Sequence, residues 1–194
     1  MIRRHYWFLL GFLLALAAGW GAFPLALYRS EPQPLQFSHH THTGETLGLD
    51  CADCHGFDSD GRFQGIPSTE RCSECHSVAL GTSADEQRLV SEYAEQARGI
   101  PWKVYARQPD NVWFPHAAHV LRGELSCDVC HGLHGQSASL REVQTNRLSG
   151  YSRDVWGARI GGSLWGPPQG MKMDRCIACH AEHGRTEGCI ACHR

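Results

Sequence analysis

One five-residue pattern, Cys-x-x-Cys-His, constrains this chain more than any other feature, because its copies use all 10 cysteines. The spacing is the attachment signature of c-type haem. Two thiols on one helical turn add to the vinyl groups of the porphyrin, and the next residue lies under the iron as its proximal axial ligand. The sequence predicts five covalent haems, held by Cys51, Cys54 and His55; Cys72, Cys75 and His76; Cys127, Cys130 and His131; Cys176, Cys179 and His180; and Cys189, Cys192 and His193.

Zinc is the alternative interpretation of these cysteines. The first two copies fit the spacing of a four-cysteine zinc site, formed by Cys51, Cys54, Cys72 and Cys75. Zinc does not explain the histidines, however. With 13 His in 194 residues, the chance of finding His after every second cysteine is roughly one in a million. Haem is therefore the stronger prediction, and no thiol is left for a disulfide or a nucleophile.

A second repeat precedes two of the haem motifs. Residues 37–42 and 114–119 both read Phe-x-His-x-x-His, and the first motif cysteine follows the phenylalanine by 14 and 13 residues. Pro115 suits the first turn of a helix, which would place two histidines on one face. We expect each segment to supply distal axial ligands to two neighbouring haems, with surface histidines as the alternative. The expected ligands are His39, His42, His116 and His119.

The remaining histidines exceed what five bis-His haems require. His134 and His183 each follow a motif histidine by three residues and are further distal candidates, and His40 is a possible one. The surplus histidines either lie on the surface or ligate a sixth haem that lacks its own cysteine pair. Met171 and Met173 are alternative axial ligands, and a thioether would raise the reduction potential of its haem.

The N-terminal region has a different character. Residues 6–28 contain no formal charge and are long enough to cross a bilayer core of about 30 Å. Arg3 and Arg4 precede them, which places residues 1–5 in the cytoplasm by the positive-inside bias. A cleaved signal peptide is the alternative, but its apolar run is usually shorter. We predict a single-pass anchor in a bacterial inner membrane, a linker over residues 29–36, and a periplasmic haem domain over residues 37–194.

Charge and length limit the haem domain. Two of the 18 basic residues lie in the first 28 positions, so the outer part carries 16 basic and 20 acidic residues, a net charge of −4. Such a surface favours a basic redox partner and offers nothing obvious to nucleic acid. The 166 outer residues amount to about 33 per haem, too few for a conventional core. Short helices and irregular loops wrapped around the haems are therefore expected.

Two segments between the motifs have expected structures of their own. Ser83 to Glu86 reads as a capping box, followed by a helix with an apolar face that extends to a stop at Gly99. Residues 136–170 are rich in Gly, Arg and Trp and are expected to form an irregular loop that contacts another protein or binds propionates. Motif spacing predicts an N-terminal haem pair, a middle haem and a C-terminal pair, arranged as a wire.

The repeated histidine segments resemble class III multihaem cytochromes c. Residues 65–69 (Gly-Ile-Pro-Ser-Thr), Ile100-Pro101-Trp102 and Trp113-Phe114, together with the N-terminal anchor, are similar to the cytochrome subunit of two related membrane complexes. These are the menaquinone reductase of sulfate-reducing bacteria, which we favour, and alternative complex III. The resemblance implies a class III-like multihaem fold and six haems, whereas only five motifs occur here, so a sixth haem would be unconventional.

The resemblance also implies partners and a role. Electrons would come from a soluble, lysine-rich periplasmic tetrahaem cytochrome c. They would pass through iron–sulfur and molybdopterin-oxidoreductase-like subunits to an integral membrane quinone-binding subunit. In alternative complex III the direction is reversed. We expect a non-catalytic electron relay in a respiratory chain.

Two rival functions remain. A self-sufficient tetrahaem-type quinol dehydrogenase also has one N-terminal helix, but its family lacks the Phe-x-His-x-x-His repeats. A multihaem nitrite reductase needs an open iron position, often with Lys in place of the motif histidine. All five motifs here end in His, and distal candidates are in surplus.

Overall fold

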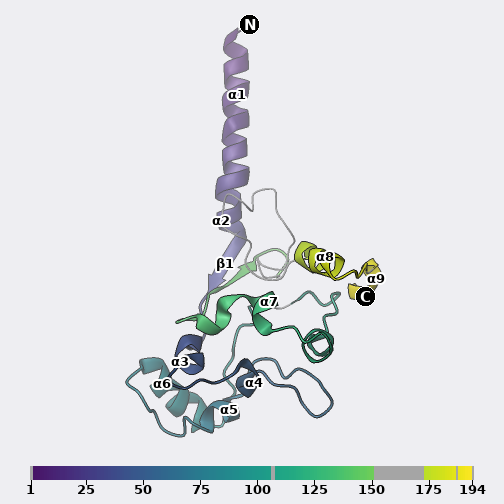
Figure 1. Cartoon of the computed structure of the whole chain (residues 1–194). Helices are drawn as coiled ribbons and strands as arrows, with labels where there is room; N and C mark the ends of the chain where they lie inside the picture. The colour runs from purple at the N-terminus through teal and green to yellow at the C-terminus, as the bar shows by residue number, and fades with distance from the viewer. Residues whose placement is uncertain (1, 106–107, 151–172, 187, 194) are drawn as a thin grey trace.

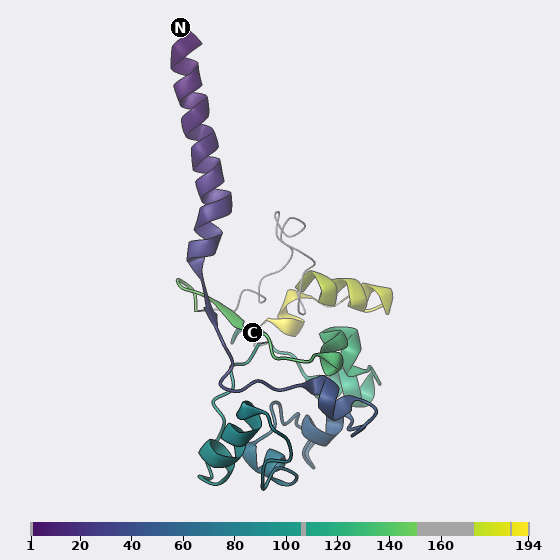
Figure 2. The same ribbon diagram turned by 90° about the vertical axis from the view of Figure 1, so that its left-hand side faces the viewer.

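The computed structural model describes residues 2–105, 108–150, 173–186 and 188–193. A long helical stem at the N-terminus leads into a body of short helices and connecting segments (Figure 1). A view turned by 90° shows the same separation of stem and body (Figure 2).

The stem consists of three consecutive helical segments. They are α1 (Ile2–Ala17), the π-helical turn η1 (Ala18–Ala22) and α2 (Phe23–Leu27). The π turn contains Gly19 and Gly21 and is followed by Pro24, residue types that weaken regular α-helical hydrogen bonding. Residues His5–Ala22 are long and apolar enough to cross a membrane, and no part of that stretch is buried in the protein. This length and composition fit a membrane anchor and equally an export signal.

A two-stranded sheet joins the base of the stem to the body. Strand β1 (Tyr28–Glu31) pairs antiparallel with β2 (Val143–Asn146), with Tyr28 opposite Asn146 and Glu31 opposite Val143. The expected linker at 29–36 therefore begins as a strand, and the expected irregular loop at 136–170 contains its partner. These short polar strands show no apolar alternation that would reveal them in the sequence. Residues 151–170 of that loop, and Met171 after it, lie outside the described residues.

The body is built from helices of few turns, as the sequence predicts. The described ones are α3 (His39–Thr43), α4 (Cys51–Cys54), α5 (Thr69–Ser73), α6 (Ala84–Arg88), η2 (Leu89–Ala94), η3 (Ala118–Arg122), α7 (Cys127–His131), η4 (Leu133–Gln136), α8 (Met173–Glu182) and α9 (Cys189–Cys192). Among the described residues, the buried apolar side chains are Leu35, Val90, Tyr93 and Val143. So small an apolar core agrees with a chain that wraps around prosthetic groups.

The amphipathic helix expected after Ser83 is present and begins there, but its capping interaction and its end differ from the prediction. It comprises α6 and the π-helical η2, and it buries Val90 and Tyr93 on one face. The capping box is wrong, because the Ser83 side chain makes no capping hydrogen bond. The Glu86 carboxylate instead accepts hydrogen bonds from residues upstream of the helix. At the other end, Ala97 adopts a φ of 48°, so the helix stops before Gly99.

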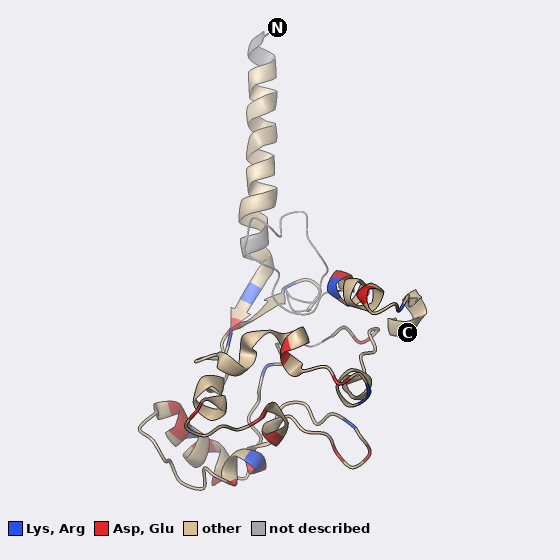
Figure 3. Cartoon of the chain, in the orientation of Figure 1, with Lys and Arg blue, Asp and Glu red and all other residues tan. Residues whose placement is uncertain are grey.

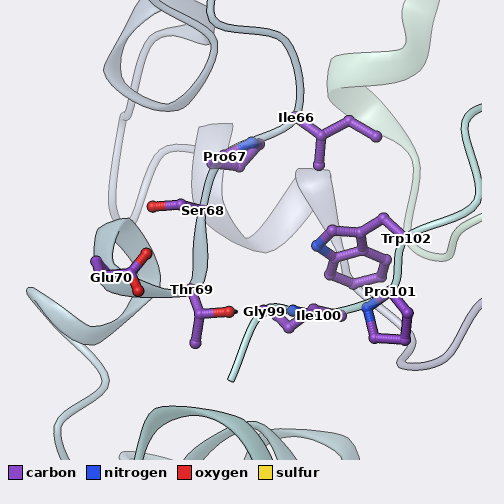
Figure 4. Close-up of a pocket in the computed structure, with 9 residues that line it drawn as sticks. All are labelled: Ile66, Pro67, Ser68, Thr69, Glu70, Gly99, Ile100, Pro101 and Trp102. Carbon is purple, nitrogen blue, oxygen red and sulfur yellow. Dashed lines mark hydrogen bonds between the residues drawn. The ribbon is translucent and has the colours of Figure 1, made fainter. Parts of the chain in front are cut away.

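Two segments that carry the family resemblance lie against each other. Residues 66–70 and 99–102 line an open pocket of about 330 Å³ (Figure 4). Between them, the Thr69 hydroxyl donates to the carbonyl oxygen of Arg98 over 2.9 Å and accepts from the backbone N–H of Ile100 over 3.2 Å. Thr69 is only 3% exposed. The hydroxyl therefore fixes the start of α5, which carries Cys72, against the segment that follows η2.

Replacing this hydroxyl should destabilise the body. Thr69→Val keeps the side-chain shape but leaves a buried N–H and carbonyl unpaired, so the free energy of unfolding should fall by about 1–3 kcal/mol. Guanidinium unfolding of the haem-loaded protein measures the change. Thr82→Val, at an exposed position, is the matched control. Equal effects of the two substitutions would contradict the role of the Thr69 hydroxyl.

Candidate haem sites

The two Phe-x-His-x-x-His segments have nearly identical local geometry. Phe37 meets the His39 ring edge-on, with centroids 4.9 Å apart, and stacks on His42 at 4.3 Å. Phe114 meets the His116 ring edge-on at 4.9 Å and stacks on His119 at 4.4 Å. The phenylalanine of each repeat thus supports both of its histidines. The sequence repeat is also a structural repeat.

Histidines of these segments face motif histidines. The ring centroids of His42 and His76 are 6.1 Å apart, those of His116 and His131 are 6.3 Å apart, and those of His119 and His180 are 6.1 Å apart. The rings of His116 and His131 are almost parallel, at 2°. Histidines of each repeat therefore lie next to a histidine of a haem motif, and those of the second repeat face two different motifs.

Hydrogen bonds to ring nitrogens fix several histidines. In His42, His119 and His183, Nδ1 bonds to the carbonyl oxygen four residues earlier, at 2.8, 3.0 and 2.9 Å. In His55, Nδ1 bonds to the Gly65 carbonyl at 2.7 Å, and in His39 it contacts the Ser137 hydroxyl at 3.2 Å. A carbonyl acceptor places the proton on Nδ1 and leaves Nε2 free to bind a metal.

His76 has a different partner. Its Nδ1 lies 2.9 Å from Oε1 of Glu86, and the two side chains are 21% and 15% exposed. The same carboxylate accepts hydrogen bonds from the backbone N–H groups of Leu80 and Gly81, at 2.8 and 2.9 Å. The N–H of Leu80, followed by those of Gly81 and the His76 ring, lowers the pKa of Glu86 against the opposing effect of burial. No local pattern in the sequence reveals this contact, because Glu86 fits a capping box equally well.

Burial sets the charge state of four other histidines. It lowers the pKa of His39, His116, His131 and His134, with smaller contributions from nearby cationic groups. For His39 the first of these neighbours is His55. A lowered pKa keeps the imidazole neutral at physiological pH, which is the form that ligates a metal.

The cysteine pairs follow one another in space. Cys54 of the first motif lies near Cys72 and Cys75 of the second, and Cys51 lies near Cys127 of the third. Cys130 interacts with the fourth motif through Cys179 and Cys176, and Cys176 interacts with Cys192 of the fifth. The motifs therefore form a row in the order second, first, third, fourth, fifth. This row groups the motifs as the spacing predicts, as a pair, a middle motif and a pair, and it places the second motif at one end.

The fifth motif is attached to the start of the second histidine repeat. The backbone N–H of Trp113 donates to the Cys192 carbonyl over 2.8 Å, and Val112 forms a β-bridge with His193. Residues 112–114 thus hold α9 close to the segment whose histidines face the third and fourth motifs.

Comparison with known proteins identifies the family. A family model described as cytochrome c3 matches residues 39–143, which is more than half of the chain. The chain belongs to the cytochrome c3 family. It is also 38% identical, over 202 aligned positions, to the menaquinone reductase multihaem cytochrome c subunit of Nitratidesulfovibrio vulgaris. The alignment covers 96% of this chain and 89% of that relative, so the predicted resemblance and fold class are confirmed. A cytochrome c3 relative with five Cys-x-x-Cys-His motifs binds multiple c-type haems.

The donor geometry fits haem. Two axial imidazoles on one iron need about 2 Å for each Fe–N bond and about 1.2 Å from each nitrogen to its ring centroid, or roughly 6.4 Å in all. The three ring pairs, at 6.1 to 6.3 Å, match this separation. Within the described residues, no three His, Cys, Asp or Glu side chains are grouped to hold one metal ion. The four-cysteine zinc arrangement is therefore not formed there.

The remaining candidate ligands of this cytochrome are placed less specifically. His40 is exposed, and its backbone N–H donates to Ser137. The His134 ring meets Tyr105 edge-on at 6.0 Å, and His183 follows the end of α8. Met173, at the start of α8, is 57% exposed. Sequence reasoning missed Phe63, which stacks on His116 at 4.1 Å. No local pattern links Phe63 to that histidine.

The equivalence of the two repeats can be tested through their phenylalanines. Phe37→Leu and Phe114→Leu each remove a stacked ring, and each should lower the free energy of unfolding by about 0.5–1.5 kcal/mol. Chemical unfolding of the haem-loaded protein measures both values, which should agree closely. Phe8→Leu, in the stem, should leave unfolding of the body unchanged. A clear effect at only one repeat would argue against equivalent roles.

Proposed function

We propose that this cytochrome is the electron-transfer subunit of a membrane quinone oxidoreductase complex of the menaquinone reductase type. It would relay electrons between a soluble periplasmic cytochrome c and partner redox subunits leading to menaquinone. The alignment over 96% of the chain with a subunit of that name carries the proposal. The chain's own residues act by holding and orienting haems, so we assign it no catalytic residue.

The ring geometry supports specific axial pairs. His42 would pair with His76, His116 with His131, and His119 with His180. Because the repeats are equivalent, His39 would pair with His55, the proximal ligand of the motif that follows it. Each haem supplies an iron that gains and loses one electron.

His134 and His183 remain for His193 and for a possible sixth haem, and the exposed His40 is left unassigned. The Nδ1 bond of His183 matches those of His42 and His119, which favours His183 as a ligand. A pyridine haemochrome assay before and after acid extraction separates five covalent haems from six. Acid-extractable haem would support a sixth haem that lacks thioether bonds.

The position of the stem supports anchorage in a membrane. Its apolar side chains are exposed, and a bilayer is the environment that would cover them. Both views place α5 at the end of the body furthest from α1, and α8 closer to the base of the stem (Figures 1 and 2). With the stem in an inner membrane and the body in the periplasm, the row of motifs would lead away from the bilayer to the second motif.

Charge supports a basic partner at that far end. Residues 50–98 contain 10 acidic and 4 basic side chains, a net charge of −6. The rest of the outer part has 12 basic and 10 acidic residues, a net charge of +2, by difference from the totals of 16 and 20. Acidic residues gather on α5 and α6 (Figure 3). A lysine-rich soluble tetrahaem cytochrome would be steered to this surface.

The other proposed partners follow from the complex. They are iron–sulfur and molybdopterin-oxidoreductase-like subunits, an integral membrane quinone-binding subunit, and lipid around the stem. A second candidate function is the quinol-oxidising direction of alternative complex III, or a self-sufficient quinol dehydrogenase. The acidic far end favours exchange with a soluble cytochrome in either direction.

The first experiment separates a relay from a quinol dehydrogenase. The detergent-solubilised cytochrome is mixed with a menaquinol analogue or with a reduced, basic tetrahaem cytochrome c, and its haem absorbance is followed. We expect rapid reduction by the cytochrome and none by the quinol, because quinone chemistry would reside in another subunit. Fast, inhibitor-sensitive reduction by the quinol alone would overturn the relay.

The ligand assignment predicts a contrast between two nearby histidines. His42→Ala removes the ring opposite His76, so one haem should change from low-spin to high-spin, as measured by EPR and absorbance. His40→Ala is the matched control and should leave every haem low-spin, because His40 is exposed and has no facing ring among the described residues. High-spin haem in the His40 variant but not in the His42 variant would reverse the assignment.

A further inference from the structure

The contact between His76 and Glu86 distinguishes the second motif from the others. In the part of the chain that the structure describes, His76 is the histidine whose ring nitrogen is bonded to a carboxylate. The Nδ1 partners of His39, His42, His55, His119 and His183 are neutral oxygens. The second motif also lies at one end of the row.

The carboxylate is held in place by the loop before α6. Oε1 accepts from the Leu80 N–H as well as from His76, and Oε2 accepts from the Gly81 N–H. A Cβ atom at position 81 would lie 2.9 Å from Oε2 of Glu86, closer than real Cβ contacts. Glycine at this position therefore permits the close approach of the carboxylate. The bond to His76 is preorganised and does not depend on a freely rotating side chain.

The surroundings keep the interaction strong. The His76 and Glu86 side chains are mostly buried, at 21% and 15% exposed, so solvent screens the contact only partly. A glutamate is ionised at neutral pH by its ordinary acidity. The Nδ1–H of His76 therefore donates to a carboxylate, which is a stronger bond than one to a backbone carbonyl.

An anionic acceptor changes the ligand itself. It draws the Nδ1 proton away from the ring and makes the other nitrogen, Nε2, more basic. A more basic axial ligand stabilises ferric over ferrous iron, so it lowers the reduction potential of its haem. We propose that Glu86 is a positioning residue that lowers the reduction potential of the haem held by Cys72, Cys75 and His76. This proposal rests on the haem ligation stated under the proposed function.

The location gives this tuning a role. The second motif lies far from the stem, within the acidic region that would receive a soluble partner (Figures 1 and 3). A lowered potential at that end sets the minimum reducing power that a docking donor must have. Glu86 would thus select partners by potential, whereas the surrounding carboxylates select them by charge.

Glu86→Gln tests the proposal in the full, haem-loaded protein. The amide keeps the side-chain size but removes the charge, so the potential of this haem should rise. At a fixed potential, we expect the ratio of reduced to oxidised haem at this site to increase about tenfold or more. This change corresponds to a rise in the reduction potential of about 59 mV. A redox titration followed by the methyl NMR resonances of the haem on Cys72 and Cys75 measures this shift. The remaining haems should change little.

Glu92→Gln is the matched control. It removes the same charge from the same helical region, but Glu92 is 48% exposed and pairs with Arg88. Equal shifts in the two variants would overturn the proposal, because they would reflect surface charge alone. A purely structural role would lower the stability of the Glu86 variant and leave the potential unchanged, which would also overturn it.

Gly81→Ala provides a second, independent variant. It keeps every charge, but its Cβ displaces the carboxylate, so the same haem should again rise in potential. If Glu86→Gln does not load haem, this variant decides the question, and an unchanged potential overturns the proposal. The wild-type EPR spectrum separates the two levels of inference. A high-spin or non-bis-His haem at the second motif would refute the proposed ligation, whereas unshifted variants of a bis-His haem would refute only the role of Glu86.

Discussion

The separation between facing histidine rings is the constraint on which the rest of the structure depends. It must stay near 6 Å for two imidazoles to share one iron. The three ring pairs join positions 34, 15 and 61 residues apart in the chain (76 − 42, 131 − 116 and 180 − 119). With the proposed axial pairs, metal cross-links over such loops would replace apolar packing as the source of order. The few buried apolar residues of the described chain agree with this arrangement.

The chain has two ways of keeping these rings in position. Phenylalanines restrict ring tilt from the side, and hydrogen bonds at Nδ1 restrict rotation and select the tautomer. Phe114 and the Pro115 carbonyl together hold His119 in both respects. Because proline has no N–H, its carbonyl is the hydrogen-bonding group that residue 115 can offer. The stacking on phenylalanine and the hydrogen bond at Nδ1 both form within one six-residue segment, so the segment provides both wherever it occurs in the chain.

The predictability of each feature from sequence follows from this distinction between local and distant contacts. Cys-x-x-Cys-His and Phe-x-His-x-x-His are visible because their chemistry requires fixed spacing along the chain. The sheet between β1 and β2 joins segments more than 100 residues apart without apolar alternation, so no local signal reveals it. The capping-box prediction for Glu86 is wrong because the contacts of this residue depend on how the loop at Leu80 and Gly81 turns. The position of the second motif at the end of the row has the same cause, since contacts between distant parts of the chain determine it.

The sheet at the base of the stem has a mechanical consequence. Tyr28 to Glu31 pair with Val143 to Asn146, and the Lys103 ammonium binds the Glu31 carboxylate at 2.7 Å. Strand β2 and Lys103, which lie in separate parts of the body, therefore both bind the residues that follow the helix. A flexible tether would let the body swivel, whereas paired strands and an ion pair at this joint would limit that rotation. With the stem in a bilayer, rotation of the helix would turn the whole body about the membrane normal, and contacts made by either part would orient the other.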